Sequence, residues 1–170
     1  MVARNKNNEY RSPFIMGEAI NYKVVQKVLT SWELASQTYS NREEIGMQVL
    51  LCMFRTKPET KHVFGFSPKQ NVEANPMFKM GAMIHGKRIY SMLDQTLSLV
   101  GPDMEALVEF LETLGEKHSL HGVKAKYFTY MCDSVREVLS IKLGDKYSPE
   151  DDDAWKELLK FLSISITQNL

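Results

Sequence analysis

The amino-acid sequence predicts an all-α protein of seven or eight helices. Apolar residues recur at three- and four-residue spacing over several segments, which is the pattern of one buried helix face. Asparagine, aspartate, serine, proline and glycine stand at the ends of these segments, where helices begin and end. No segment of convincing length alternates between apolar and polar residues, and no unit repeats along the chain. Neither a sheet nor a repeat array is therefore expected.

The 170 residues are expected to form a short extension followed by one domain. Residues 1–19 are polar, lack helical periodicity and contain Pro13 and Gly17, which predicts a flexible N-terminal extension. Residues 20–170 carry all of the helical segments and are long enough to enclose one hydrophobic core.

Two amphipathic helices are predicted first, over residues 22–37 and 41–56. Ser40 and Glu43 have the spacing of a capping box, which predicts the start of the second helix. That helix must end before Pro58, because proline restricts the residue ahead of it. The inward-facing positions of the two helices include Tyr22, Val25, Leu29, Trp32, Ile45, Val49, Leu50, Met53 and Phe54.

A short helical turn is predicted after Pro58, followed by a polar loop. Asn75 can then cap a long helix that has Pro76 at its first position and runs to about Leu99. Asp103 can cap the next helix. Its apolar stripe, Leu107, Leu111 and Leu114, ends at His118, which therefore points into the interior.

The last two predicted helices begin after Gly122 and after Ser148. Gly144 ends the first of them, and Ser148-Pro149 provides an N-cap and a first-turn proline for the second. Their inward-facing positions are Tyr127, Phe128, Met131, Val135, Val138, Leu139, Trp155, Leu159, Leu162 and Ile166.

Composition and charge exclude several classes of protein. Twenty-one basic and 21 acidic residues leave no net charge, which argues against a nucleic-acid-binding protein. Cys52 and Cys132 lie far apart and form no CxxC pair, so neither a zinc site nor a disulfide framework is predicted. No apolar run reaches the length of a membrane span, and the N-terminus lacks the apolar core of a signal peptide. A cytoplasmic protein is therefore expected.

Motifs of common enzymes are also missing from the sequence. It contains no GxSxG nucleophile elbow and no glycine-rich phosphate loop. The acidic run Glu150–Asp153 lacks the alternating ligands and central glycine of a calcium loop, and suits the first turn of a helix.

Two histidines, His85 and His118, lie within the apolar stripes of separate helices. Each can be a core histidine paired with a nearby carbonyl, or a ligand to a metal. Two imidazoles alone do not complete a zinc site, because tetrahedral zinc needs further ligands. They can bind the iron of a planar macrocycle from its two faces, and the surrounding leucine, methionine and phenylalanine side chains would cover such a ring.

From about residue 20 to the C-terminus, the chain resembles the globins. It is more similar to the neuroglobin type of nerve tissue, in which two histidines bind the iron, than to the muscle oxygen-storage type. The resemblance rests on short motifs that follow one another in the right order. These motifs are Thr30-Ser31-Trp32, Lys57-Pro58-Glu59-Thr60 ahead of Phe64, Pro76-Met77-Phe78 ahead of His85, Leu114-Gly115-Glu116-Lys117-His118, Gly122-Val123-Lys124 and Ala154-Trp155.

The resemblance implies a pocket for haem b (iron protoporphyrin IX), with His118 as the proximal iron ligand and His85 as the distal one. His121, three residues after His118, is the rival for the proximal role. Other residues are expected to contact the ring or its substituents. They are Phe64 at the corner before the distal helix, Leu50 over the distal pocket, Ile89 one turn after His85, Val123 on the proximal side and Arg88 beside a propionate.

The function implied by the resemblance is that of a six-coordinate, bis-histidyl haem globin. Such a protein would take part in redox sensing or electron transfer with a partner protein, or would bind O2, CO and NO. We expect these activities rather than enzymatic turnover, with nitrite or NO chemistry as the enzymatic alternative. Two other readings are a five-coordinate oxygen storage or transport globin and a haem-free helical interaction module.

Overall fold

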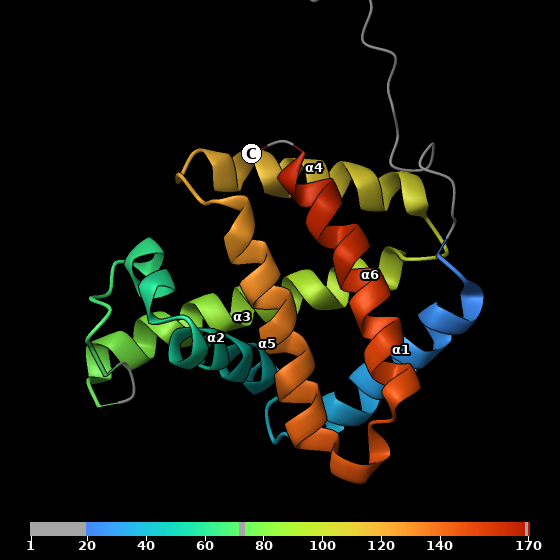
Figure 1. Ribbon diagram of the computed structural model, residues 1–170, viewed down its shortest axis with the longest axis horizontal. Helices are drawn as coiled ribbons and strands as arrows, with labels where there is room; N and C mark the ends of the chain where they lie inside the picture. The colour runs from blue at the N-terminus through green and yellow to red at the C-terminus, as the bar shows by residue number, and fades with distance from the viewer. Residues whose placement is uncertain (1–19, 72–73, 169) are drawn as a thin grey trace, which may run out of the picture.

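The computed structural model describes residues 20–71, 74–168 and 170 (Figure 1). Over these residues the chain forms six α-helices and two 3₁₀ helices and has no strand, which confirms the all-α prediction. The predicted extension, residues 1–19, lies outside the described residues. Within the described part of the chain, no helix combines the length and the apolar character needed to cross a membrane.

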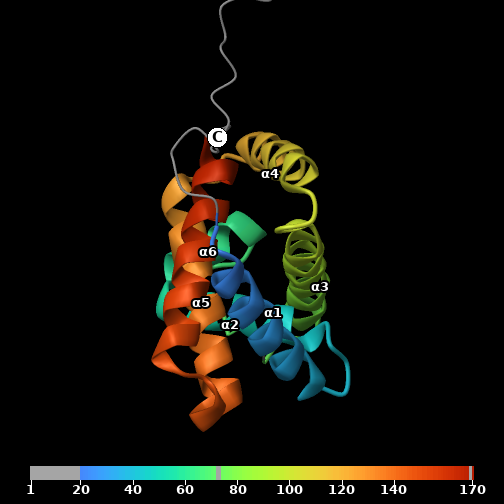
Figure 2. The same cartoon turned by 90° about the vertical axis from the view of Figure 1, so that its right-hand side faces the viewer.

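Several helices that are far apart in the sequence pack against one another. Helix α2 packs against α3 and α5, while α6 packs against α1, α4 and α5. Figure 2 shows α3 and α4 on one side of the molecule, and α5 with α6 on the other. The elements are α1 (Tyr22–Gln37), α2 (Glu44–Thr56), η2 (Pro58–Phe64), α3 (Pro76–Leu99), α4 (Met104–Ser119), α5 (Ala125–Leu143), η3 (Gly144–Lys146) and α6 (Pro149–Thr167).

Three of the predicted N-caps form as expected. The side chains of Asn75, Asp103 and Ser148 accept hydrogen bonds from backbone amides in the first turns of α3, α4 and α6. Ser148 also forms a capping box with Asp151. Each cap satisfies amides that the helix leaves unpaired, and so sets where the helix begins.

The start of α2 differs from the prediction, because the expected capping box of Ser40 and Glu43 does not form. Instead, the Asn41 side chain accepts from the amide of Glu43 at 3.1 Å, and the Asn41 carbonyl accepts from the amide of Glu44 at 3.0 Å. The Glu43 carboxylate pairs with Lys87 on α3, with 2.7 Å between oxygen and nitrogen. A local turn thus precedes α2, which begins at Glu44.

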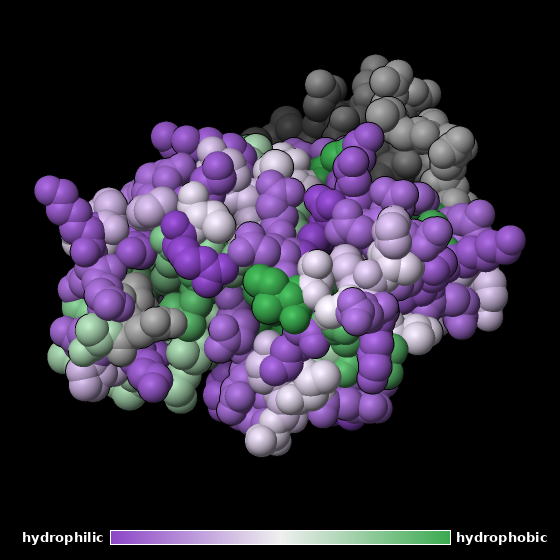
Figure 3. Space-filling view, turned by 60° about the horizontal axis from the view of Figure 1, so that its bottom comes forward, coloured by the Kyte–Doolittle hydropathy of each residue, from purple (hydrophilic) through white to green (hydrophobic). Residues whose placement is uncertain are grey.

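The main core lies where α1, α5 and α6 meet. Trp155 is fully buried, and its indole nitrogen donates to the Ser31 hydroxyl at 2.8 Å. Trp32 packs beside it, with 6.0 Å between ring centroids. A second, smaller cluster around α2 consists of Leu50, Met53, Phe54, Phe66 and Ala82. The face drawn in Figure 3 is mostly hydrophilic, with separate apolar patches.

Candidate functional site

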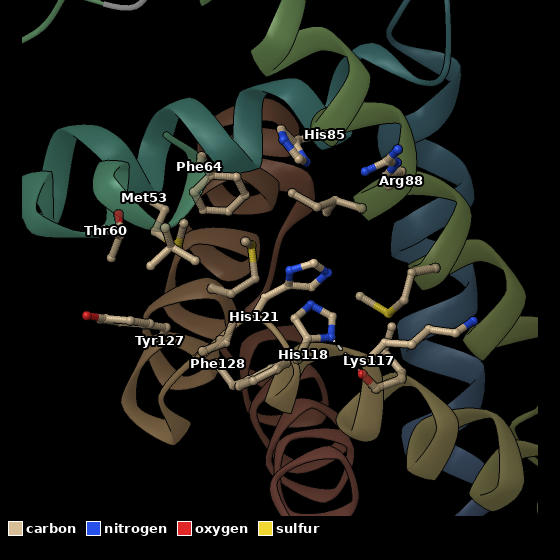
Figure 4. Close-up of a pocket in the computed structure, with 16 residues that line it drawn as sticks. Met53, Thr60, Phe64, His85, Arg88, Lys117, His118, His121, Tyr127 and Phe128 are labelled. Atoms are coloured by element: carbon tan, nitrogen blue, oxygen red, sulfur yellow. Dashed lines mark hydrogen bonds between the residues drawn. The ribbon is translucent and has the colours of Figure 1, made fainter. Parts of the chain in front are cut away.

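A pocket of about 540 Å³ opens between α3 and α4, with α5 and η2 forming its other walls (Figure 4). This volume lies within the range of roughly 300–1,000 Å³ that is usual for small-molecule and cofactor sites. Most of its lining is apolar, and the polar groups are few. The lining residues are Met53, Thr60, Val63, Phe64, His85, Arg88, Ile89, Met92, Leu114, Lys117, His118, His121, Val123, Tyr127, Phe128 and Met131.

His118 enters the pocket from the last turn of α4, as the leucine stripe predicted. Its Nδ1 lies 2.7 Å from the carbonyl oxygen of Leu114, one turn earlier in the helix. Since a carbonyl only accepts, Nδ1 carries the proton and donates. The edge-on ring of Phe128, 5.2 Å away between centroids, packs against the imidazole. The hydrogen bond and the Phe128 contact therefore fix the orientation of the other ring nitrogen, Nε2.

His85 faces the pocket from α3, on the side opposite His118 (Figure 4). The ring is half-buried and, within the described residues, makes no hydrogen bond. Burial, with a smaller contribution from the charge of Arg88, lowers the pKa of His85 below its ordinary value of 6.5. The imidazole is thus mostly neutral at pH 7, which leaves a lone pair available to a metal.

Phe64 holds the corner of the pocket beside His85. It ends η2, which begins at Pro58, and Gly65 follows it in the left-handed conformation at φ 78°. The Phe64 and His85 ring centroids lie 5.0 Å apart, with an angle of 81° between the ring planes. Phe54 of α2 packs against the other side of Phe64, at 5.2 Å. The position predicted for Phe64 therefore brings it into contact with His85.

Most of the other predicted site residues also reach the pocket. Ile89 and Val123 line it, and so do Arg88 and Lys117, whose side chains are otherwise exposed. No acidic side chain belongs to the described lining, and its charged side chains, Arg88 and Lys117, are basic. His121, the rival for the proximal role, lines the pocket as well.

Leu50 does not belong to this lining. It is fully buried in α2 against Met53, Phe54 and Phe66, and Met53, three residues further along the helix, forms the wall instead. Its role over the distal pocket stays a prediction.

Several lining residues were not assigned to the pocket from sequence, although the helical periodicity marked six of them as inward-facing. These six are Met53, Met92, Leu114, Tyr127, Phe128 and Met131, while Thr60, Val63 and Lys117 carried no such signal.

The pocket suits an iron macrocycle better than a bare metal ion. Across the described residues, no group of three or more His, Cys, Asp and Glu side chains could hold a metal ion. A ring that brings its own equatorial ligands needs only the axial imidazoles, which His118 and His85 offer from two sides. The apolar wall and the basic side chains also fit a flat apolar ring with carboxylate substituents.

Comparison with known proteins gives a consistent picture. The family model described as Globin matches residues 48–166. An extracellular monomeric globin of Tubifex tubifex is 28% identical over 140 residues, which cover 82% of this chain and 93% of the relative. A neuroglobin of Dissostichus mawsoni is 24% identical over 155 residues, covering 89% and 92%. The anaerobic nitrite reductase HBII of Casuarina glauca is 28% identical over 143 residues, covering 82% and 85%.

A solved structure also resembles this fold. The crystal structure of a hexacoordinated haem protein from an anhydrobiotic tardigrade superimposes with a TM-score of 0.70 and 21% sequence identity, covering 88% of this chain and 94% of that protein. At this identity the likeness concerns the fold alone.

Proposed function

Because this chain belongs to the globin family, we propose that it holds haem b between His118 and His85, with both imidazoles bound to the iron in the resting protein. One observation carries the proposal. The two imidazoles face the same apolar pocket from opposite sides, one fixed by its Nδ1–H and the other neutral and without a hydrogen bond. Both nitrogens needed for axial ligation are therefore available.

His118 acts as the permanent ligand in this proposal. Donation from Nδ1 to the Leu114 carbonyl holds the tautomer and the ring orientation, and makes Nε2 a stronger ligand. Phe128 limits rotation of the ring, and Val123 supports the same side of the pocket.

His85 acts as the exchangeable ligand. Only the edge contact with Phe64 and the surrounding pocket hold its ring, so the imidazole can swing away without breaking a hydrogen bond. A small ligand that competes with His85 binds only the open form, and its apparent affinity falls in proportion to the population of that form. Arg88, one turn along α3, lies where it can pair with a propionate at the pocket edge.

Bound haem supplies exchange between ferric and ferrous iron and a binding position for O2, CO or NO. Redox sensing, electron transfer to a partner protein, or reaction with NO or nitrite are the functions we propose. The names of the neuroglobin and nitrite reductase relatives, and of the hexacoordinated tardigrade protein, support this choice. Enzymatic activity would be limited to the nitrite and NO reactions. The free thiols of Cys52 and Cys132 support a cytoplasmic location, where thiols stay reduced.

Absorption spectra of the haem-loaded protein test the proposal. We expect sharp, split visible bands for the dithionite-reduced protein under argon, and a change in those bands when CO is added. A single broad band before CO would contradict bis-histidine ligation and would favour the five-coordinate oxygen-storage alternative. Protein that stays colourless after expression with added haem would favour the interaction module instead.

A further inference from the structure

A third imidazole, that of His121, reaches the same pocket. The residue as a whole is exposed, yet its side chain lines the cavity together with His85 and His118. In Figure 4 the His121 ring lies beside the His118 ring, on the side toward His85.

The turn that ends α4 places His121 there. The amides of His121 and Val123 both donate to the carbonyl of His118, at 3.1 and 3.2 Å, and the Gly122 amide donates to Ser119 at 3.0 Å. Gly122 has a φ of 66°, a left-handed conformation that glycine adopts at low cost. The backbone thus folds back over the last turn. Helix α4 ends at Ser119, so it is this turn that carries the His121 side chain back beside that of His118.

Both ring nitrogens of His121 are also without a hydrogen-bond partner among the described residues. Within the described chain, the side chain makes no ion pair either. His118, by contrast, uses its Nδ1 to bond Leu114. The exposed His62 on η2 provides a contrast, because its Nδ1 contacts the Glu59 carbonyl and its ring packs edge-on against Tyr127. His62 does not line the pocket. His121 alone therefore combines access to the proximal side with two unused nitrogens.

We infer that His121 is a reserve proximal ligand, which binds the haem iron when His118 is removed or dissociates. This inference rests on the proposed haem binding. In the exchange, the iron–nitrogen bond to His118 breaks and one to His121 forms. No electron is transferred. His118 remains the preferred ligand because its ring is already oriented by Leu114 and Phe128.

Four variants test the inference by absorption spectroscopy of the haem-loaded, dithionite-reduced protein: His118→Ala, His121→Gln, the double variant and His62→Gln as the matched control. We expect His118→Ala to keep the split six-coordinate bands through His85 and His121, and the double variant to lose them. Haem transfer to an excess of a haem-free acceptor globin should be about tenfold or more faster from the double variant than from His118→Ala. His62→Gln should keep the bands of the parent protein, and His121→Gln is the single-variant reference for the double variant.

Identical spectra and identical haem loss for His118→Ala and the double variant would overturn the inference. Far-ultraviolet circular dichroism checks that each variant is folded. If His118→Ala has lost its helices, His118→Gln, which keeps the side-chain volume, takes its place under the same criterion. Failure of the proposed function is distinguishable from failure of the reserve role. The first would remove the six-coordinate bands from the parent protein and from His62→Gln, whereas the second would leave both six-coordinate.

Discussion

Gly46 of α2 and Gly86 of α3 bring the backbones of the two helices into direct contact. A Cβ atom on Gly46 would lie 2.0 Å from the carbonyl oxygen of Gly86, and one on Gly86 would lie 2.6 Å from the Cα of Met47. Neither helix can yield by moving a flexible side chain, because the opposing atoms belong to the backbone. Gly86 directly follows His85, so this crossing also positions the His85 side chain at the pocket.

Gly46→Ala should therefore destabilise the protein. Overpacking typically costs about 1–3 kcal/mol, and we expect the upper part of that range because backbone atoms are opposed. Urea unfolding measures the change in free energy of unfolding. Gly81→Ala in α3 is the control, since its new Cβ would meet only the tip of the Phe66 ring at 3.2 Å, while helix propensity gains up to about 1 kcal/mol. Equal stability of the two variants would contradict the view that backbone atoms limit how closely α2 and α3 can approach at Gly46.

His85→Leu should convert the haem-loaded protein to a five-coordinate form with a higher apparent affinity for CO. Leucine keeps the pocket apolar but cannot bind iron, so the competing internal ligand is lost. If the open form of the parent is about 0.1–10% populated, the affinity should rise roughly tenfold to a thousandfold. Equilibrium titration and flash photolysis with CO measure the effect. His62→Leu makes the same replacement outside the pocket, and a comparable rise there would argue against competition by His85.

Ser31→Ala should leave the buried indole N–H of Trp155 without its acceptor. An unsatisfied buried donor costs about 1–3 kcal/mol, which urea or thermal unfolding can resolve. Ser36→Ala provides the matched control in the same helix, because the buried Ser36 hydroxyl has no hydrogen-bond partner within the described chain. We expect that replacement to be nearly neutral. A loss as large for Ser36→Ala as for Ser31→Ala would show that packing, not the hydrogen bond, dominates.

Low pH should reduce the free energy of unfolding, in part because the Asp152 carboxylate becomes protonated. Hydrogen bonds from Arg136 hold the pKa of this carboxyl below its ordinary value of 3.8, although partial burial opposes the shift, and the Tyr147 hydroxyl also donates to it at 3.1 Å. The unfolded chain then binds its proton at a higher pH than the folded chain. The free energy of unfolding must therefore fall as the pH drops below 3.8 toward the folded-state pKa.

Unfolding by urea at a series of acidic pH values should show a shallower decline for Asp152→Asn than for the parent. Asp153→Asn, at the exposed neighbouring position, should follow the parent curve. Parallel curves for the parent and Asp152→Asn would show that Asp152 does not contribute to the loss of stability in acid.

Local sequence chemistry was enough to predict much of the fold. The caps at Asn75, Asp103 and Ser148 are confirmed, and so is the inward direction of the stripe that ends at His118. The globin family and fold, inferred from short ordered motifs, are confirmed by the family match and by the structural likeness. These features depend on interactions between residues close in sequence, or on several motifs that support one another.

Tertiary contacts explain what the sequence did not predict. Helix α2 begins late because Glu43 pairs with Lys87 on another helix instead of capping its own. The lining position of Met53 was not predicted because the packing of α2 against α3 sets which side of α2 faces the pocket. The inward turn of His121 depends on a backbone conformation at Gly122, which residue spacing does not reveal.

The contact between α1 and α6 constrains how the chain matures during synthesis. Trp155 bonds Ser31, and Lys27 pairs with Asp151 at 3.2 Å, so the core joins residues from near the two ends of the helical region. Every residue that lines the pocket lies between Met53 and Met131, and thus leaves the ribosome before α6 does. All residues of the described pocket lining are therefore synthesised before the contact between α1 and α6 can form. Helix α1 also packs against α5, but its contacts with α6 form only once the last helix has been translated.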